Sequence, residues 1–206
     1  MKIIKPMLIF ISLWTTVCFA QLLPPPSDKT STHNRHFWLN VALGVGGTKS
    51  IVGKRFRNYG GVAGELSLNY RLNYHWLLTA RSIHLISYPY FNGRTTDCAL
   101  FNTSSCDEKQ SWTSDKGVLM GYILQGDYGY GTLSLGLAHT EGITSAGSTK
   151  DEFNTIGFPL ESQVFWTPSG FFGLGLIAFA NINKYRWFGG TLLALQLGDF
   201  QRTTGD

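Results

Sequence analysis

The residues that could support nucleophilic catalysis gather in one short stretch, which contains Ser134, His139, Thr140 and Glu141. A nucleophile and its base must lie within hydrogen-bonding reach of each other. Residues 132–139 alternate leucine with small residues, which is typical of a strand, and neighbours along a strand point to opposite faces. His139 shares the parity of the leucines, whereas Ser134 and Thr140 have the other parity. The pattern therefore favours a strand without a catalytic pair.

Cys98 and Cys106 could form a disulfide, since they lie close together in a polar segment of a chain that carries an export signal. No His or further Cys stands near them to complete a metal site. The glycines of "GVGG" and "GLG" are not followed by a helix that could hold a phosphate. The sequence therefore predicts no metal, no nucleotide and no other cofactor.

The export signal is predicted from residues 1–20. Lys2 and Lys5 form a basic start, an apolar run follows, and small residues stand at the −3 and −1 positions of a cleavage site after Ala20. We expect residues 21–35, which are rich in proline and polar residues, to be an extended linker. The polar residues 201–206 are expected to be a tail.

The composition limits the class of protein. The 206 residues include 24 glycines and are 14% aromatic, yet only 15% are charged. Loss of Lys2 and Lys5 with the signal lowers the formal net charge from +4 to +2. So small a positive charge does not indicate a nucleic-acid-binding protein. Beyond the signal, no apolar run approaches the roughly 18 residues that a spanning helix needs.

The mature chain alternates between apolar and small or polar residues in eight segments separated by turns and loops. The expected strands cover residues 37–46, 62–71, 76–88, 116–125, 132–139, 154–166, 171–181 and 187–197. Alternation is irregular in the third segment, where a bulge is one explanation. We expect an irregular segment at 89–114 and a polar loop at 141–152. Eight antiparallel strands of about ten residues are typical of an all-β, up-and-down transmembrane barrel.

The two strand faces differ in kind. One is rich in leucine and valine, and the other consists mostly of small residues with a few charges, among them Glu65, Arg81 and Glu161. A narrow lumen would suit the second face, since eight strands leave room for little more than side chains. We predict that the leucines face lipid and that Glu65, Arg81 and Glu161 form a lumenal ion-pair network. A soluble secreted barrel with the opposite assignment of faces stays as an alternative.

Connections are short after the second, fourth and sixth strands and longer after the first, third and fifth, an asymmetry typical of outer-membrane barrels. The first long loop has a basic cluster that could meet lipopolysaccharide phosphates. Aromatic residues are expected to form a girdle at each rim. The basic cluster is Lys49, Lys54, Arg55 and Arg57, and the girdles are Phe37, Trp38, Tyr70, Tyr74, Trp76, Tyr128, Tyr130, Trp166, Phe171 and Phe200 at one rim and Tyr59, Tyr88, Tyr90, Phe91, Trp112, Phe153, Tyr185 and Trp187 at the other.

With its signal, its loop asymmetry and segments such as "FWLNVALGVG" and "TLLALQL", the chain resembles the small bacterial outer-membrane β-barrel proteins of the OmpA and OmpX type over residues 36–200. The resemblance implies export to the outer membrane of a Gram-negative-type bacterium. We expect a side-chain-filled lumen and a structural or surface-interaction role. Expected partners are outer-membrane lipid, lipopolysaccharide and a surface ligand or protein at the outer loops. We expect no enzyme, with a lipid-modifying barrel as the alternative.

Overall fold

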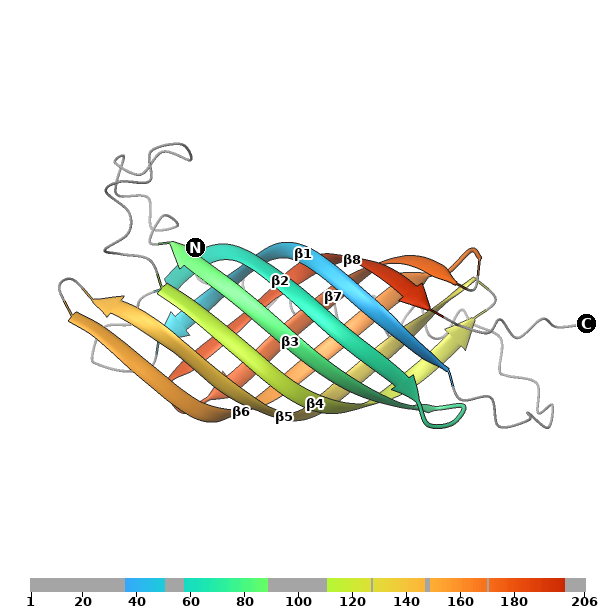
Figure 1. Ribbon diagram of the computed structural model, residues 1–206, viewed down its shortest axis with the longest axis horizontal. Helices are drawn as coiled ribbons and strands as arrows, with labels where there is room; N and C mark the ends of the chain where they lie inside the picture. The colour runs from blue at the N-terminus through green and yellow to red at the C-terminus, as the bar shows by residue number, and fades with distance from the viewer. Residues whose placement is uncertain are drawn as a thin grey trace, which may run out of the picture.

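The computed structural model describes residues 36–50, 58–88, 111–126, 128–146, 149–169 and 171–198. Eight strands form one closed barrel, shown in Figure 1. The strands are β1 (Phe37–Ser50), β2 (Asn58–Arg71), β3 (Trp76–Tyr88), β4 (Ser111–Gly126), β5 (Gly129–Ala146), β6 (Thr149–Trp166), β7 (Phe172–Asn183) and β8 (Arg186–Gly198). The predicted signal, linker and tail lie outside the described residues.

Each strand pairs antiparallel with its sequence neighbour, and β8 closes the barrel against β1 from Trp38↔Gly198 to Ser50↔Arg186. Closure leaves no strand edge with unpaired backbone groups, which a bilayer could not satisfy. Glycine is required at this seam, since a Cβ on Gly44 would lie 2.2 Å from the carbonyl oxygen of Thr191. The predicted eight-stranded antiparallel barrel is confirmed.

Turn side chains help to reverse the chain. Asn73 Oδ1 accepts hydrogen bonds from the backbone N–H groups of His75 and Trp76, both at 2.9 Å, between β2 and β3. Asn183 Oδ1 does the same for Tyr185 and Arg186 at the other end of the barrel, between β7 and β8. Asparagine favours such turns because its side chain can replace a backbone acceptor.

The strands have between 12 and 18 residues. Seven of them are longer than the sequence indicates, whereas β3 has the predicted bounds. The predicted polar loop at 141–152 is wrong, because β5 and β6 continue as a paired hairpin to Ala146 and Thr149. This hairpin extends beyond the other strands at the left of Figure 1. The sequence of its tip has no apolar alternation, yet the backbone pairing continues through it.

The irregular pattern of β3 has a simpler cause than a bulge. Pairing of β2 with β3 runs without interruption from Gly60↔Tyr88 to Arg71↔Leu77. Arg81 faces the lumen together with Ile83 and Leu85, and all three are buried. Apolar residues on both faces hide the alternation, so the bulge that the sequence suggested is absent from this strand.

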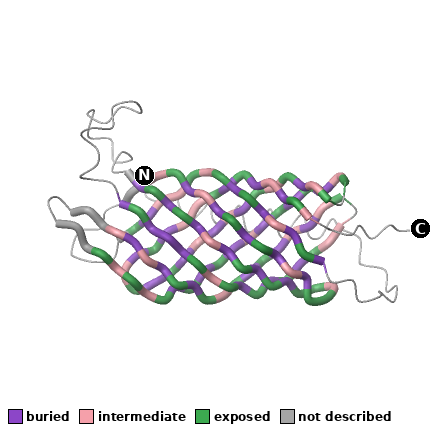
Figure 2. Tube along the Cα trace, viewed as in Figure 1, coloured by how far each residue is buried: buried purple, intermediate pink, exposed green. Residues whose placement is uncertain are grey.

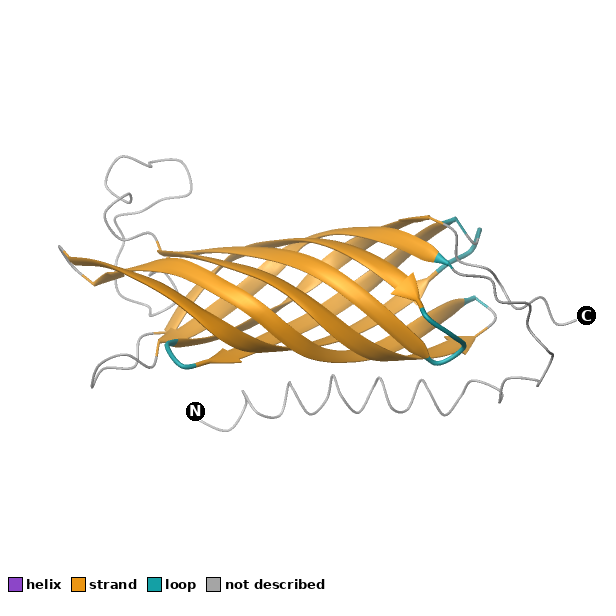
Figure 3. Ribbon diagram, turned by 60° about the horizontal axis from the view of Figure 1, so that its bottom comes forward, coloured by secondary structure: helices purple, strands orange, loops and turns teal. Residues whose placement is uncertain are grey.

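Burial alternates along the strands, as the bands of Figure 2 show. In β5 the side chains of Leu135 and Leu137 are 67% and 59% exposed, whereas Thr132 and Ser134 are buried. The leucine face therefore points outward, as predicted. An apolar outside suits lipid and does not suit a water-soluble barrel. Figure 3 shows the described residues as strands and turns, and none of them forms a helix long and apolar enough to cross a membrane.

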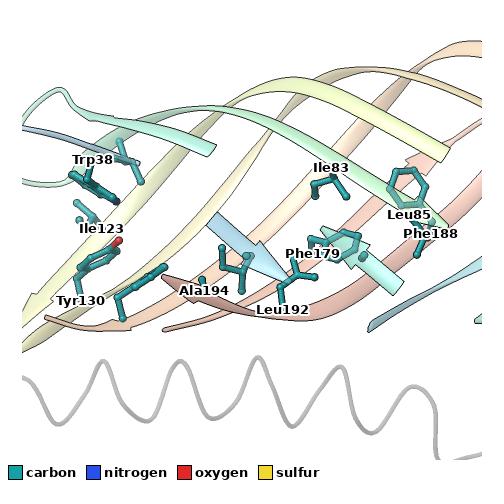
Figure 4. Packing of buried hydrophobic residues seen from close by; sticks show 14 residues of the cluster. Trp38, Ile83, Leu85, Ile123, Tyr130, Phe179, Phe188, Leu192 and Ala194 are labelled. Atoms are coloured by element: carbon teal, nitrogen blue, oxygen red, sulfur yellow. The ribbon is translucent and has the colours of Figure 1, made fainter. Parts of the chain in front are cut away.

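The lumen holds larger side chains than expected. Trp38 and Tyr130, predicted as rim aromatics, are buried inside the barrel with Ile123, and a second group that includes Phe179 and Phe188 lies further along the axis (Figure 4). Glycines make room for these rings: a Cβ on Gly190 would lie 3.0 Å from the Phe179 ring. Large residues on one wall thus pack against small ones on the next.

Candidate functional site

Arg81 of β3 is the centre of a buried ionic cluster in the lumen. Its Nη1 lies 2.5 Å from Glu161 Oε2 of β6, and its Nη2 lies 3.0 Å from Asp115 Oδ2 of β4. All three side chains are fully buried. One guanidinium thus bridges carboxylates of two other strands, and charge-assisted hydrogen bonds of this kind are the strong ones.

Neutral side chains complete the cluster. Asp115 Oδ1 accepts hydrogen bonds from Asn181 Nδ2 at 2.7 Å and from Thr140 Oγ1 at 2.8 Å. Glu161 Oε1 accepts one from Gln163 Nε2 at 2.5 Å, and Gln163 Oε1 in turn accepts one from Asn40 Nδ2 at 3.4 Å. Residues from six strands therefore meet in one hydrogen-bonded layer, which ties opposite walls of the barrel together.

Glu65 also faces the lumen and is buried. Among the described residues, neither of its carboxylate oxygens has a hydrogen-bond partner, and it takes part in no ion pair. The structure thus brings Arg81 and Glu161 into contact but leaves Glu65 outside their ion pairs. Sequence reasoning missed Asp115, because the expected strand began at residue 116. The shared parity of Thr113, Asp115 and Gly117 is the signal that could have found it.

Apolar layers enclose the ionic cluster along the barrel axis, as the inward-facing residues of β3 show in the order Leu77, Arg81 and Leu85. On the side of the chain termini, the ring of Tyr130 stacks on Phe165 at 5.3 Å and meets Trp38 edge-on at 5.5 Å. Such packing excludes water around the charges, which strengthens their interaction.

The other end of the barrel, away from the first residue of β1 and the last of β8, is here called the distal end. At its mouth, Arg186 Nη1 donates to Thr113 Oγ1 at 2.7 Å, and its guanidinium lies 5.1 Å from the centre of the Phe153 ring. Phe153, expected in the outer aromatic girdle, thus packs beside a lumenal arginine. Trp112 and Trp187 do face outward near this end.

The catalytic pairs considered from the sequence do not form. His139 faces outward, whereas Ser134 and Thr140 face the lumen, and the Thr140 hydroxyl binds Asp115. Glu141 faces outward and pairs with Lys116 at 3.4 Å. Within the part of the chain that the structure describes, no three His, Cys, Asp or Glu residues are grouped so that they could hold a metal ion.

The predicted surface features are only partly visible. Lys49 is exposed near the distal end of β1. Lys54, Arg55 and Arg57 lie outside the described residues, as do Cys98 and Cys106.

No protein-family model matches the chain, and no curated protein matches its sequence. Solved structures do match its fold. Neisserial surface protein A (NspA) superposes with a TM-score of 0.60 at 13% identity, over 80% of this chain and 99% of that one. Ail, the attachment invasion locus protein of Yersinia pestis, was solved in complex with the heparin analogue sucrose octasulfate. It superposes with a TM-score of 0.50 at 12% identity, over 80% of this chain and 99% of that one. The chain thus shares the fold of small outer-membrane β-barrels.

Proposed function

We propose that this chain is an integral outer-membrane barrel with a filled lumen and a structural or surface-interaction role. The observation that supports it most is the distribution of polarity. The outward face exposes large apolar residues on all eight strands, while the ionic cluster is buried inside. Only a lipid environment makes this arrangement favourable.

We further propose that the distal end faces the cell exterior. Strand β1 begins and strand β8 ends at the opposite end, whereas Tyr88 and Ser111, which the long connection joins, lie at the distal end. After export, such barrels keep short turns in the periplasm and long loops outside. Residues 1–20 would serve as the export signal, and Cys98 and Cys106 would form a disulfide in the long distal segment.

Recognition would then belong to the distal loops. The basic cluster consists of Lys49 near the end of β1 and of Lys54, Arg55 and Arg57 in the connection to β2, and it could bind the phosphates of lipopolysaccharide. Ail, which shares this fold, was solved with a polyanion, sucrose octasulfate. That complex supports an anionic surface ligand for the present chain.

The filled lumen argues against a diffusion pore, because rings and an ionic cluster occupy it. We expect no stepwise conductance when the barrel is added to planar bilayers. Among the residues that the structure describes, the candidate catalytic side chains Ser134, His139 and Thr140 do not come together, which gives the lipid-modifying alternative no support. Mass spectrometry of lipid A from cells with and without the protein should give identical spectra, and a modified species would overturn this part of the proposal.

Cell fractionation combined with limited proteolysis tests the location. The protein should partition with outer membranes and migrate faster on gels before boiling than after. When intact cells are treated with trypsin, the protein should be cleaved within residues 89–110, at Arg94 or Lys109. The linker at 21–35, with Lys29 and Arg35, should be cut only after the outer membrane is permeabilised. Recovery in the soluble fraction, or early cleavage of the linker, would contradict the proposal.

A further inference from the structure

The outward wall of β4, β5 and β6 has an ordered series of rows near the distal end. Val118 pairs with Leu137 in the last fully apolar row, and both are more than half exposed. The next row toward the distal end is Lys116, His139 and Ile156, the following row is Ser114, Glu141 and Asn154, and the last is Trp112, Ile143 and Glu152. The wall therefore changes from apolar to cationic, then to anionic with an aromatic ring.

The charges in these rows are open to a ligand. Lys116 Nζ lies 3.4 Å from Glu141 Oε1, but the two side chains are 60% and 37% exposed, so their pair is weak and can be shared. Glu152 is exposed and has no ion pair among the described residues. Beside it, a hollow of about 290 Å³ is lined by Trp112, Glu141, Glu152 and neighbouring residues.

A ligand that fits this order has an apolar chain, then an anion, then a cation. A lysine ammonium binds phosphate as a point charge. Carboxylates accept hydrogen bonds from an ammonium group, and a tryptophan ring attracts a cation to its face. A purely anionic lipid would meet the two glutamates beyond Lys116, and a basic peptide would meet Lys116 and the apolar row. A zwitterionic lipid satisfies every row.

We propose that this wall binds a lipid that carries a phosphoethanolamine group. The acyl chains would lie along Val118 and Leu137, the phosphate would meet Lys116, and the ammonium would enter the hollow between Glu152 and Trp112. This inference rests on the proposed function, because it needs the barrel to stand in a membrane with its distal end at the headgroup level.

The lumen provides a matched control. Glu65 of β2 faces the lumen and is 4% exposed, so a lipid outside the barrel cannot contact it. Glu65→Gln therefore makes the same substitution as Glu152→Gln without touching the proposed site.

Native mass spectrometry of the full mature chain, refolded in neutral detergent, tests the proposal. The barrel is mixed with equal amounts of phosphatidylethanolamine and phosphatidylglycerol that carry the same acyl chains. The wild-type barrel should retain phosphatidylethanolamine about two- to fivefold over phosphatidylglycerol, which is the fold change expected of an exposed ion pair. Glu152→Gln should remove that preference, Lys116→Gln should reduce retention of both lipids, and Glu65→Gln should behave as wild type.

Equal retention of the two lipids by the wild type would overturn the proposal, as would a Glu65→Gln variant that loses the preference. Unboiled gel mobility shows whether each variant is folded, and the two site variants act at separate rows, so either of them alone decides. A barrel that passes the fractionation and protease test but shows no lipid preference would refute this inference alone. A barrel that fails the former test would refute the proposed function.

Discussion

Asp115 and Lys116 are neighbours in β4, yet their side chains enter opposite environments. Asp115 joins Arg81 and Glu161 in the fully buried lumenal cluster, whereas Lys116 pairs with Glu141 on the outside, where both side chains are partly exposed. A buried pair cannot exchange its partner for water, while an exposed one can. Because adjacent residues of a strand face opposite sides, a shift of one residue separates a charge that stabilises the fold from a charge that is available to a ligand.

Among the substitutions that test this comparison, Arg81→Leu in the lumen is expected to have the largest effect on stability. The substitution leaves Asp115 and Glu161 buried without a cation, which should lower the free energy of unfolding by about 3–5 kcal/mol. Urea titration of barrels refolded in detergent or vesicles measures the change. Glu65→Gln is the control, since Glu65 is a buried lumenal carboxyl group outside the ion pairs of the described residues, and its effect should be much smaller. Equal losses for the two variants would show that the ion pairs do not hold the barrel.

The outward face is tested at the middle of the apolar band. Leu135→Arg places a charge on an exposed position of β5, and a charge near the bilayer midplane should cost about 2–4 kcal/mol. Unfolding in lipid vesicles gives the cost directly, and Leu135→Met serves as a neutral control. If the arginine variant assembles and unfolds like the wild type, the leucines do not face lipid.

The packing of the lumen wall is probed with glycine. A Cβ on Gly190 would lie 2.3 Å from the carbonyl oxygen of Val45, so Gly190→Ala should lower the free energy of unfolding by about 1–3 kcal/mol. The matched change Gly131→Ala meets nothing closer than 3.8 Å and should be tolerated. The same urea titration compares the two, and an equal response would mean that the β1–β8 seam is not tightly packed.

The smallest effect belongs to the exposed pair. Lys116→Gln should change the free energy of unfolding by about 0–1 kcal/mol, because water replaces the ammonium beside Glu141. Its lipid retention should nevertheless fall. A large loss of stability would place Lys116 with the structural charges of the lumen and end the contrast with Asp115.

Much of the fold could be predicted from alternation. The period of two in segments such as 132–139 indicated strands, their two faces and which face meets lipid, because small residues suit a narrow lumen. Strand ends were harder: residues 141–152 read as a loop because polarity carries no information about backbone pairing. Trp38 and Tyr130 were expected at the rim, since position along a strand does not tell an outward ring from an inward one when both lie near its end.

The sequence by itself determined the eight strands, the apolar outside and the few charges that must lie inside, since each of these follows from local periodicity and composition. Only the tertiary structure decided which charges meet. Arg81, Asp115 and Glu161 lie on three different strands, and strand register together with barrel closure fixes the distances among them. Closure likewise brings Gly190 of β8 against Val45 of β1, where a Cβ would lie 2.3 Å from the carbonyl oxygen of Val45, so only a residue without a side chain fits there.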